Sequence, residues 1–297
     1  MNVFCTLSDI NYLDRGIALY ESLLEKSSEP FALYYLCLDE ETYSKIEGLN
    51  LALSSKKIIP ISLKSLEENN EVLLEAKKDR DAKDYMFTLA SYFSDYLINS
   101  VTCDSVLYID ADVYFYEDPY DIIKCCEGKH CGIMLHRHNF VGHRDGGYNV
   151  GVVWFNNSSQ GKEVLSWWKN AVLKKEPKEL SIMGDQKYLE AFEPNFGKDV
   201  IKIIDEDIGH GAPWNFRLYV YDEFDDKNII GWGDKKQKLV FNHFSQFKYS
   251  EEKGGFTPDQ DIYRHLTLNG TVFLLAPIYK MYSSYYKKLL EVKEKWL

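Results

Sequence analysis

Two aspartates, Asp110 and Asp112, have the spacing and setting in this sequence that best suit chemistry. They directly follow an apolar run at 106–109 that is bounded by polar residues, as expected of a strand covered on both faces of a sheet. In open α/β sheets, ligands bind beyond the carboxyl ends of the strands. Two carboxylates at such a place suit Mg²⁺ or Mn²⁺, which keeps open positions for phosphate oxygens. We therefore expect a metal site there.

The spacing alone is a weak signal, because Asp-x-Asp also occurs at 79–81, 205–207 and 259–261. Short motifs match by chance in an Asp-rich chain. Only the pair at 110–112 ends such a clean hydrophobic run and has a second strand-like run after it. The alternative for this pair is a solvated acidic turn.

The composition bounds the class of protein. The chain has 297 residues, of which 45% are hydrophobic, enough for a large core. A net charge of -11 repels polyanions, which argues against a general nucleic-acid binder. No secretory signal pattern or apolar stretch of membrane-spanning length is visible. Six cysteines without a C-x-x-C pair predict reduced thiols in a cytoplasmic protein.

Strand-like and helical runs alternate along the chain, which is the signature of an α/β domain. We expect strands near 3–7, 32–38, 58–63, 106–109, 131–136, 148–156, 200–204 and 239–244, with the second strand-like run after Asp112 in addition. Pro60 argues for an edge position of its strand or for an irregular ladder. Asp84 is expected to cap the helix before the central strand. No linker or internal repeat interrupts the chain, so a single domain, 1–297, is the economical expectation, with an amphipathic helix at 276–297.

Four segments, taken in order, carry a resemblance to a known family. They are Tyr108-Ile-Asp-Ala-Asp112, Tyr148-Asn-Val-Gly151, Gly184-Asp-Gln186 and Asn242-His-Phe244. Together they resemble the GT-A fold of nucleotide-sugar glycosyltransferases, and most closely the bacterial enzymes related to family 8, such as glycogenin-type and lipopolysaccharide glycosyltransferases. The resemblance covers residues 2 to about 248. It implies a Rossmann-like α/β fold with a mixed, mainly parallel central sheet flanked by helices.

The resemblance also implies a cofactor and a reaction. Asp110, Asp112 and His243 would bind Mn²⁺ or Mg²⁺, which bridges the diphosphate of a donor, with a UDP-sugar expected. A metal of this kind takes up charge on the leaving diphosphate as a Lewis acid. The acceptor would be a glycan or lipid-linked molecule in bacterial surface polysaccharide synthesis. For His243, the alternative is a core histidine beside its phenylalanine neighbours.

The family resemblance gives two further residues a catalytic task. Asp185 would stand near the anomeric carbon, where a carboxylate helps an oxocarbenium-like state, and Gln186 would orient hydroxyl groups. A simple helix cap is the alternative for Asp185. Donor-binding positions implied by the family are Thr6, Leu7, Asp9, Asp39, Lys83, Tyr108, Ala111, Asn149, Gly151, His210 and Lys248. Trp214 offers an aromatic face for a sugar ring.

The chain departs from the family in two places. Family 8 usually carries an arginine early in the helix before the metal strand, whereas this chain has 88–92 without a base and Lys83 upstream. The late His-Phe motif continues as Ser245-Gln246-Phe247, where the family prefers a glycine. Both departures bear on the donor and on retention of configuration, but they leave the metal site intact.

Several alternatives stay open. The motif at Asp110 also fits the nucleophile of haloacid-dehalogenase-type phosphatases, and a non-catalytic sugar-binding protein is a further possibility. The histidines at 136, 138 and 143 are expected in an exposed polar loop, and Cys125, Cys126 and Cys131 lack standard zinc spacing. The C-terminal helix either packs on the domain or lies on the inner face of a membrane through its lysines and aromatic residues.

Overall fold

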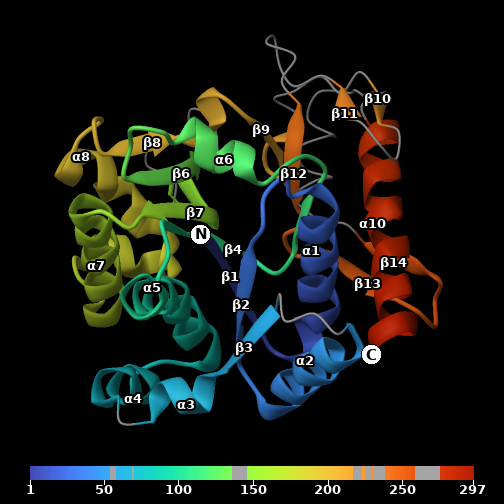
Figure 1. Ribbon diagram of the computed structural model, residues 1–297, viewed down its shortest axis with the longest axis horizontal. Helices are drawn as coiled ribbons and strands as arrows, with labels where there is room; N and C mark the ends of the chain where they lie inside the picture. Colours follow the sequence, from blue (N-terminus) through green and yellow to red (C-terminus); the bar gives the residue numbers. More distant parts are fainter. Residues whose placement is uncertain are drawn as a thin grey trace. The chain divides into compact units, whose positions relative to one another are not determined.

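Figure 1 presents the computed structural model, which describes residues 1–53, 58–68, 70–135, 146–216, 223–224, 229–230, 238–257 and 275–297. Its backbone divides into two compact units. The first unit comprises Met1–Asn11, Pro30–Asp110 and Cys126–Ile204, and the second comprises Tyr12–Glu29, Ala111–Cys125 and Asp205–Leu297. A single-domain organisation stays a prediction.

The first unit is built on a seven-stranded sheet with the order β3-β2-β1-β4-β7-β6-β8. Its strands are β1 (Asn2–Ser8), β2 (Ala32–Cys37), β3 (Ile58–Ser62), β4 (Ser105–Ile109), β6 (Cys131–Leu135), β7 (Tyr148–Asn156) and β8 (Ile201–Ile203). Strand β7 is antiparallel to both of its neighbours, β4 and β6, and the other four pairings are parallel. The mixed, mainly parallel sheet predicted from the sequence is confirmed.

Helices cover both faces of this sheet. Helices α5 (Ala82–Ser100) and α7 (Ser159–Lys174) lie side by side on one face, and α2 (Glu40–Leu53) lies on the other (Figure 1). All five residues of β4 are buried, as its unbroken apolar run predicts. Trp168 of α7 stacks on Phe155 of β7 with ring centroids 5.9 Å apart. The remaining helices of the first unit are α3 (Leu63–Glu67), α4 (Glu71–Lys78), η2 (Lys178–Met183), η3 (Gln186–Ala191) and α8 (Phe192–Phe196).

Local sequence signals place most of these elements, with one correction. Pro60 lies in β3, the end strand of the sheet order, as expected. The predicted cap of α5 is wrong: Asp81 is the N-cap, and its Oδ1 accepts the backbone N–H of Asp84 at 2.8 Å. Because both residues are aspartates three positions apart, the sequence alone does not separate them. The polar loop with His136, His138 and His143 lies outside the described residues.

The second unit holds a smaller sheet in which β12 (Leu239–His243) runs between β5 (Val113–Phe115), antiparallel, and β9 (Gly209–Gly211), parallel. The other pairs of strands are β10 (Glu223–Phe224) with β11 (Ile229–Ile230) and β13 (Lys248–Ser250) with β14 (Gly255–Thr257). Its helices are α1 (Leu13–Lys26), α6 (Tyr120–Cys125), η4 (Ile204–Glu206, whose first residue belongs to the first unit) and α10 (Leu275–Trp296); η1 (Ile10–Tyr12) precedes α1.

The predicted C-terminal helix is confirmed as α10, and its aromatic side packs inside the second unit. Tyr285 is 2% exposed and stacks on Phe244 with ring centroids 3.8 Å apart. Glu21 of α1 accepts the indole N–H of Trp296 at 2.9 Å and pairs with Lys288 at 3.4 Å. Of the two arrangements considered from the sequence, α10 therefore has the one in which the helix packs on the protein. Among the described helices, none combines the length and apolar character needed to span a membrane.

Candidate active site

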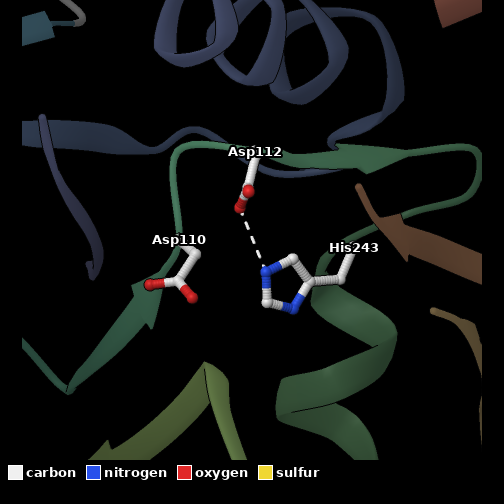
Figure 2. A group of neighbouring side chains, drawn as sticks. All are labelled: Asp110, Asp112 and His243. Atoms are coloured by element: carbon white, nitrogen blue, oxygen red, sulfur yellow. Dashed lines mark ion pairs between the residues drawn. The ribbon is translucent and has the colours of Figure 1, made fainter. Parts of the chain in front are cut away.

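Asp110, Asp112 and His243 form a group of potential metal ligands. One ligand atom from each side chain lies within 4.8 Å of the others. His243 Nε2 is 3.1 Å from Asp112 Oδ1, the contact marked by the dashed line in Figure 2. The side chains of Asp112 and His243 are 13% and 5% exposed. The three residues predicted as metal ligands are therefore brought together.

The backbone explains why these side chains meet. The backbone N–H of Asp110 donates to Gly151 O at 2.9 Å, because β7 runs antiparallel to β4 and begins where β4 ends. In the second unit, the N–H of Phe244 donates to Asp112 O at 2.9 Å, and His243 is the register partner of Val113. Strand pairing thus fixes the backbone of each ligand independently.

Neighbouring side chains hydrogen-bond to Asp110 and shift the pKa of Asp112. The hydroxyl of Tyr108 donates to Asp110 Oδ1 at 2.8 Å, and burial together with the charge of Asp110 raises the pKa of Tyr108 well above its usual value. This hydroxyl therefore stays a donor. Burial alone would raise the pKa of Asp112, but His243 and, more weakly, Arg15 hold that pKa below its usual value. Asp112 is consequently ionised near neutral pH.

The donor set fits the cation that the sequence predicted. Two carboxylates supply hard oxygen ligands and the imidazole supplies one nitrogen, which together leave further coordination positions for phosphate oxygens and water. Mn²⁺ and Mg²⁺ accept this kind of incomplete protein coordination. The identity of the ion stays a prediction.

Asp185 lies in the first unit at the entrance to η3 and is 5% exposed. Its side chain makes no capping hydrogen bond, so a simple helix cap does not explain it. The indole N–H of Trp168 donates to Asp185 O at 3.0 Å and fixes its backbone. Burial, and then the charge of Asp110, raise the pKa of Asp185 well above its usual value. A carboxyl held in this way near the potential metal ligand Asp110 is a candidate for direct chemistry.

Gly184 sets the direction in which the chain enters η3. Its φ of 60° lies in the left-handed region, and a Cβ built there would come within 2.5 Å of the Phe87 ring. Phe87 thus packs directly on the backbone before Asp185. Lys83, one turn earlier in α5, is exposed, with its Nζ 5.6 Å from the centroid of the same ring.

Asn149 joins two of the predicted segments. Its Nδ2 donates to Gln186 Oε1 at 2.8 Å, and its Oδ1 accepts the N–H of Gly151 at 2.8 Å. Asn149 is 5% exposed, and Gly151 in turn binds Asp110 through its carbonyl. The first unit therefore places Asn149, Gly151, Gln186, Asp185 and Asp110 around one point at the end of β4.

The predicted nucleoside contacts at the end of β1 divide into two groups. Thr6 and Leu7 lie inside β1 and are buried, because the strand extends to Ser8. Asp9 follows the strand. Asp39 accepts the N–H groups of Ile10 and Thr42 at 2.9 and 2.7 Å, and these bonds hold the pKa of Asp39 below its usual value although burial opposes them.

The second unit places the remaining predicted residues. His210 is 1% exposed; its Nδ1 is 2.8 Å from Asp205 Oδ1 and its Nε2 is 3.1 Å from Asn215 Nδ2. Trp214 meets the ring of His243 edge to face, with centroids 5.3 Å apart. Lys248 is exposed at the start of β13. Ala111 is buried between the two aspartates.

Sequence reasoning missed Arg15, a buried arginine in α1 whose charge acts on Asp112. The apolar spacing of Leu13, Ile17 and Tyr20 predicts an inward helical face, and the helical period places Arg15 on the opposite side of the helix. Only the long-range fold brings that position against the segment after His243. The sequence carries no local signal for it.

Comparisons with known proteins agree with this architecture. No family model matches the chain. It is 29% identical over 263 residues to the uncharacterized protein YfnF of Bacillus subtilis, and the match covers 83% of this chain and 82% of that protein.

The structure is similar to that of the galactosyltransferase LgtC in complex with donor and acceptor sugar analogs. The TM-score is 0.56 and the sequence identity 15%, and the match covers 92% of this chain and 96% of LgtC. An active-site mutant of LgtC gives a TM-score of 0.52 and 13% identity, covering 91% of this chain and 96% of that chain. The chain therefore has the GT-A glycosyltransferase fold.

Proposed function

We propose that this protein is a metal-dependent glycosyltransferase that transfers a sugar from a nucleoside-diphosphate donor, a UDP-sugar, to a hydroxyl group. The observation that carries the proposal is the group of Asp110, Asp112 and His243 at the end of β4. A bare acidic turn would not need a histidine brought from another strand of the chain. The acceptor is a glycan or a lipid-linked sugar of bacterial surface polysaccharide synthesis.

The reaction assigns a task to each part of the site. An acceptor oxygen forms a bond to C1 of the donor sugar. The bond between C1 and the diphosphate oxygen breaks, with its electron pair going to the diphosphate, and the hydroxyl proton leaves to the diphosphate or to water. Mn²⁺ or Mg²⁺ bound by Asp110, Asp112 and His243 would supply Lewis-acid stabilisation of the leaving charge.

Residues of the first unit would bind and orient the sugar of the donor. Asp185 would stabilise positive charge that develops at C1 in its ionised form. A cation bound by Asp110 would favour that form, because it offsets the Asp110 charge that contributes to the raised pKa of Asp185. Asn149 and Gln186 present a hydrogen-bonded amide pair for sugar hydroxyls. Gly151 lets the backbone approach closely, because it has no side chain. Tyr108 keeps Asp110 oriented by its 2.8 Å hydrogen bond.

The experiment that tests this function is a donor panel. UDP release from several UDP-sugars is measured with Mn²⁺, with and without sugar acceptors, alongside thermal unfolding with the same ligands. We expect one donor to raise the melting temperature in the presence of Mn²⁺ and to be consumed. Asp112→Asn should lose both effects, while Asp121→Asn, which changes a half-buried carboxylate of α6 that pairs with Lys124, should keep them.

The two rival functions give different results in the same experiment. Release of inorganic phosphate from phosphomonoesters without a sugar acceptor would identify a phosphatase and overturn the proposal. Binding of a donor without any turnover would identify a sugar-binding protein. Consumption of a UDP-sugar that needs both Asp112 and a divalent cation is the result we expect.

A further inference from the structure

Arg15 is a buried, charged residue at the start of α1. Its side chain is 9% exposed, and taking a guanidinium group out of water is unfavourable unless the group is well paired. Nη1 lies 3.0 Å from Asp14 Oδ1, and Nη2 donates to Phe247 O at 3.1 Å. The guanidinium carbon also lies 4.3 Å from the centroid of the Tyr12 ring. One arginine thus connects the start of α1 to a distant segment.

That segment runs from the metal ligand His243 to Lys248. Gln246 has a φ of 56°, in the left-handed region, and the N–H of Phe247 donates to Phe244 O at 3.0 Å. These features make a tight turn between the two functional residues. Arg15 binds the carbonyl at the end of this turn, in the residue directly before Lys248.

The residue directly after Lys248 is held by the same charged pair. The hydroxyl of Tyr249 donates to Asp14 Oδ2, and the Tyr249 ring centroid is 5.6 Å from the guanidinium carbon of Arg15. Lys248 itself is exposed. Both neighbours of Lys248 are therefore anchored inward by Asp14 and Arg15, while its own side chain projects outward.

We propose that Arg15 is a positioning residue, which with Asp14 fixes the turn from His243 to Lys248 and so aims Lys248 at the diphosphate of the donor. This inference deepens the proposed function and rests on it. A lysine at position 15 could not replace the arginine fully, because a single ammonium lacks the planar fork that reaches Asp14 and the Phe247 carbonyl together.

The test measures UDP binding by calorimetry at saturating Mn²⁺. Arg15→Met should raise the Kd for UDP about 10- to 100-fold, the range seen when residues that orient ligand-binding groups are removed. Arg15→Lys should give a smaller rise of several-fold. The matched control is Arg80→Met, because Arg80 also binds backbone carbonyls, those of Val172 and Leu173 at 2.8 and 2.7 Å, but in the first unit. Arg80→Met should leave the Kd within about twofold.

A double-mutant cycle separates positioning from general loss of structure. If Arg15 acts through Lys248, Arg15→Met should change the Kd by less than about threefold when Lys248→Met is already present. An equal loss in both backgrounds, or a Kd for Arg15→Met within threefold of the wild-type value, would overturn the inference. Should Arg15→Met fail to fold, the same cycle with Arg15→Lys decides. A wild-type protein that binds no UDP would instead refute the proposed function.

Discussion

Two buried histidines on neighbouring strands of the second unit, both expected at the candidate site from the sequence, have different surroundings. His210 on β9 and His243 on β12 each lie about 3 Å from an aspartate, at 2.8 and 3.1 Å. His210 also meets Asn215 and stacks on Phe241 with centroids 5.5 Å apart. His243 instead shares its neighbourhood with two carboxylates of the turn after β4.

The two histidines differ in the polar groups that surround each His–Asp pair. Asp205 and Asn215 approach opposite sides of the His210 ring, so this histidine is enclosed by protein groups. Around His243, the additional carboxylate of Asp110 brings negative charge that a cation would balance. The presence of a His–Asp pair is therefore no evidence for a site, whereas a second carboxylate beside the pair is.

The largest expected effect comes from Asp112→Asn. The substitution keeps the size of the side chain but removes a charged metal ligand, so transfer should fall about 10³-fold, which corresponds to roughly 4 kcal/mol of transition-state stabilisation. Steady-state kinetics across Mn²⁺ concentrations measure the loss. Wild-type turnover at ordinary Mn²⁺ would remove the distinction between His243 and His210.

Asp185→Asn should lower turnover about 10²-fold while donor affinity changes little, because the carboxylate acts on charge that develops in the transition state. The same variant should be more stable than the wild type at neutral pH. Since the pKa of Asp185 is raised above 3.8 on folding, the wild type loses stability as pH rises from that value through the higher folded pKa. Thermal unfolding from pH 4 to pH 8 should show the advantage of the variant growing. A constant difference across this range would contradict the shift.

Tyr108→Phe should have a smaller effect. It removes the 2.8 Å hydrogen bond to Asp110 but no ligand atom, so the apparent affinity for Mn²⁺ should weaken about tenfold. Titration of free Mn²⁺ by electron paramagnetic resonance measures this. Tyr20→Phe, a buried tyrosine of α1, serves as the control for removing one hydroxyl group.

Asp205→Asn should have the smallest effect on transfer and a clear effect on folding. Disruption of the contacts around His210 should lower the free energy of unfolding by about 1–3 kcal/mol, the cost of an unsatisfied buried polar group. Transfer at 25 °C should stay within about twofold. Urea unfolding and kinetics on the same sample give both values; a loss of transfer as large as that of Asp112→Asn would make His210 part of the site.

The sequence predicts the parts of this site that depend on local patterns. The apolar run before Asp110 gives β4, and the order of the motifs gives Asn149, Gln186 and His243 as its companions. The sequence does not predict a contact between a side chain and a backbone group far away along the chain. Arg15 donates to the carbonyl of Phe247, 232 positions away, and no local sequence pattern near either residue predicts that contact. Thr6 and Leu7, expected as donor contacts, lie buried inside β1, because the strand carries no local stop signal before Asp9 and extends to Ser8.

The geometry at Gly184 has a practical consequence for engineering. A larger residue there would have to displace the Phe87 ring and adopt a backbone conformation that side chains rarely reach. A mutagenesis library intended to change substrate range should therefore keep position 184 fixed. Ile182, two residues earlier, is 58% exposed, so a substitution there meets no comparable packing constraint.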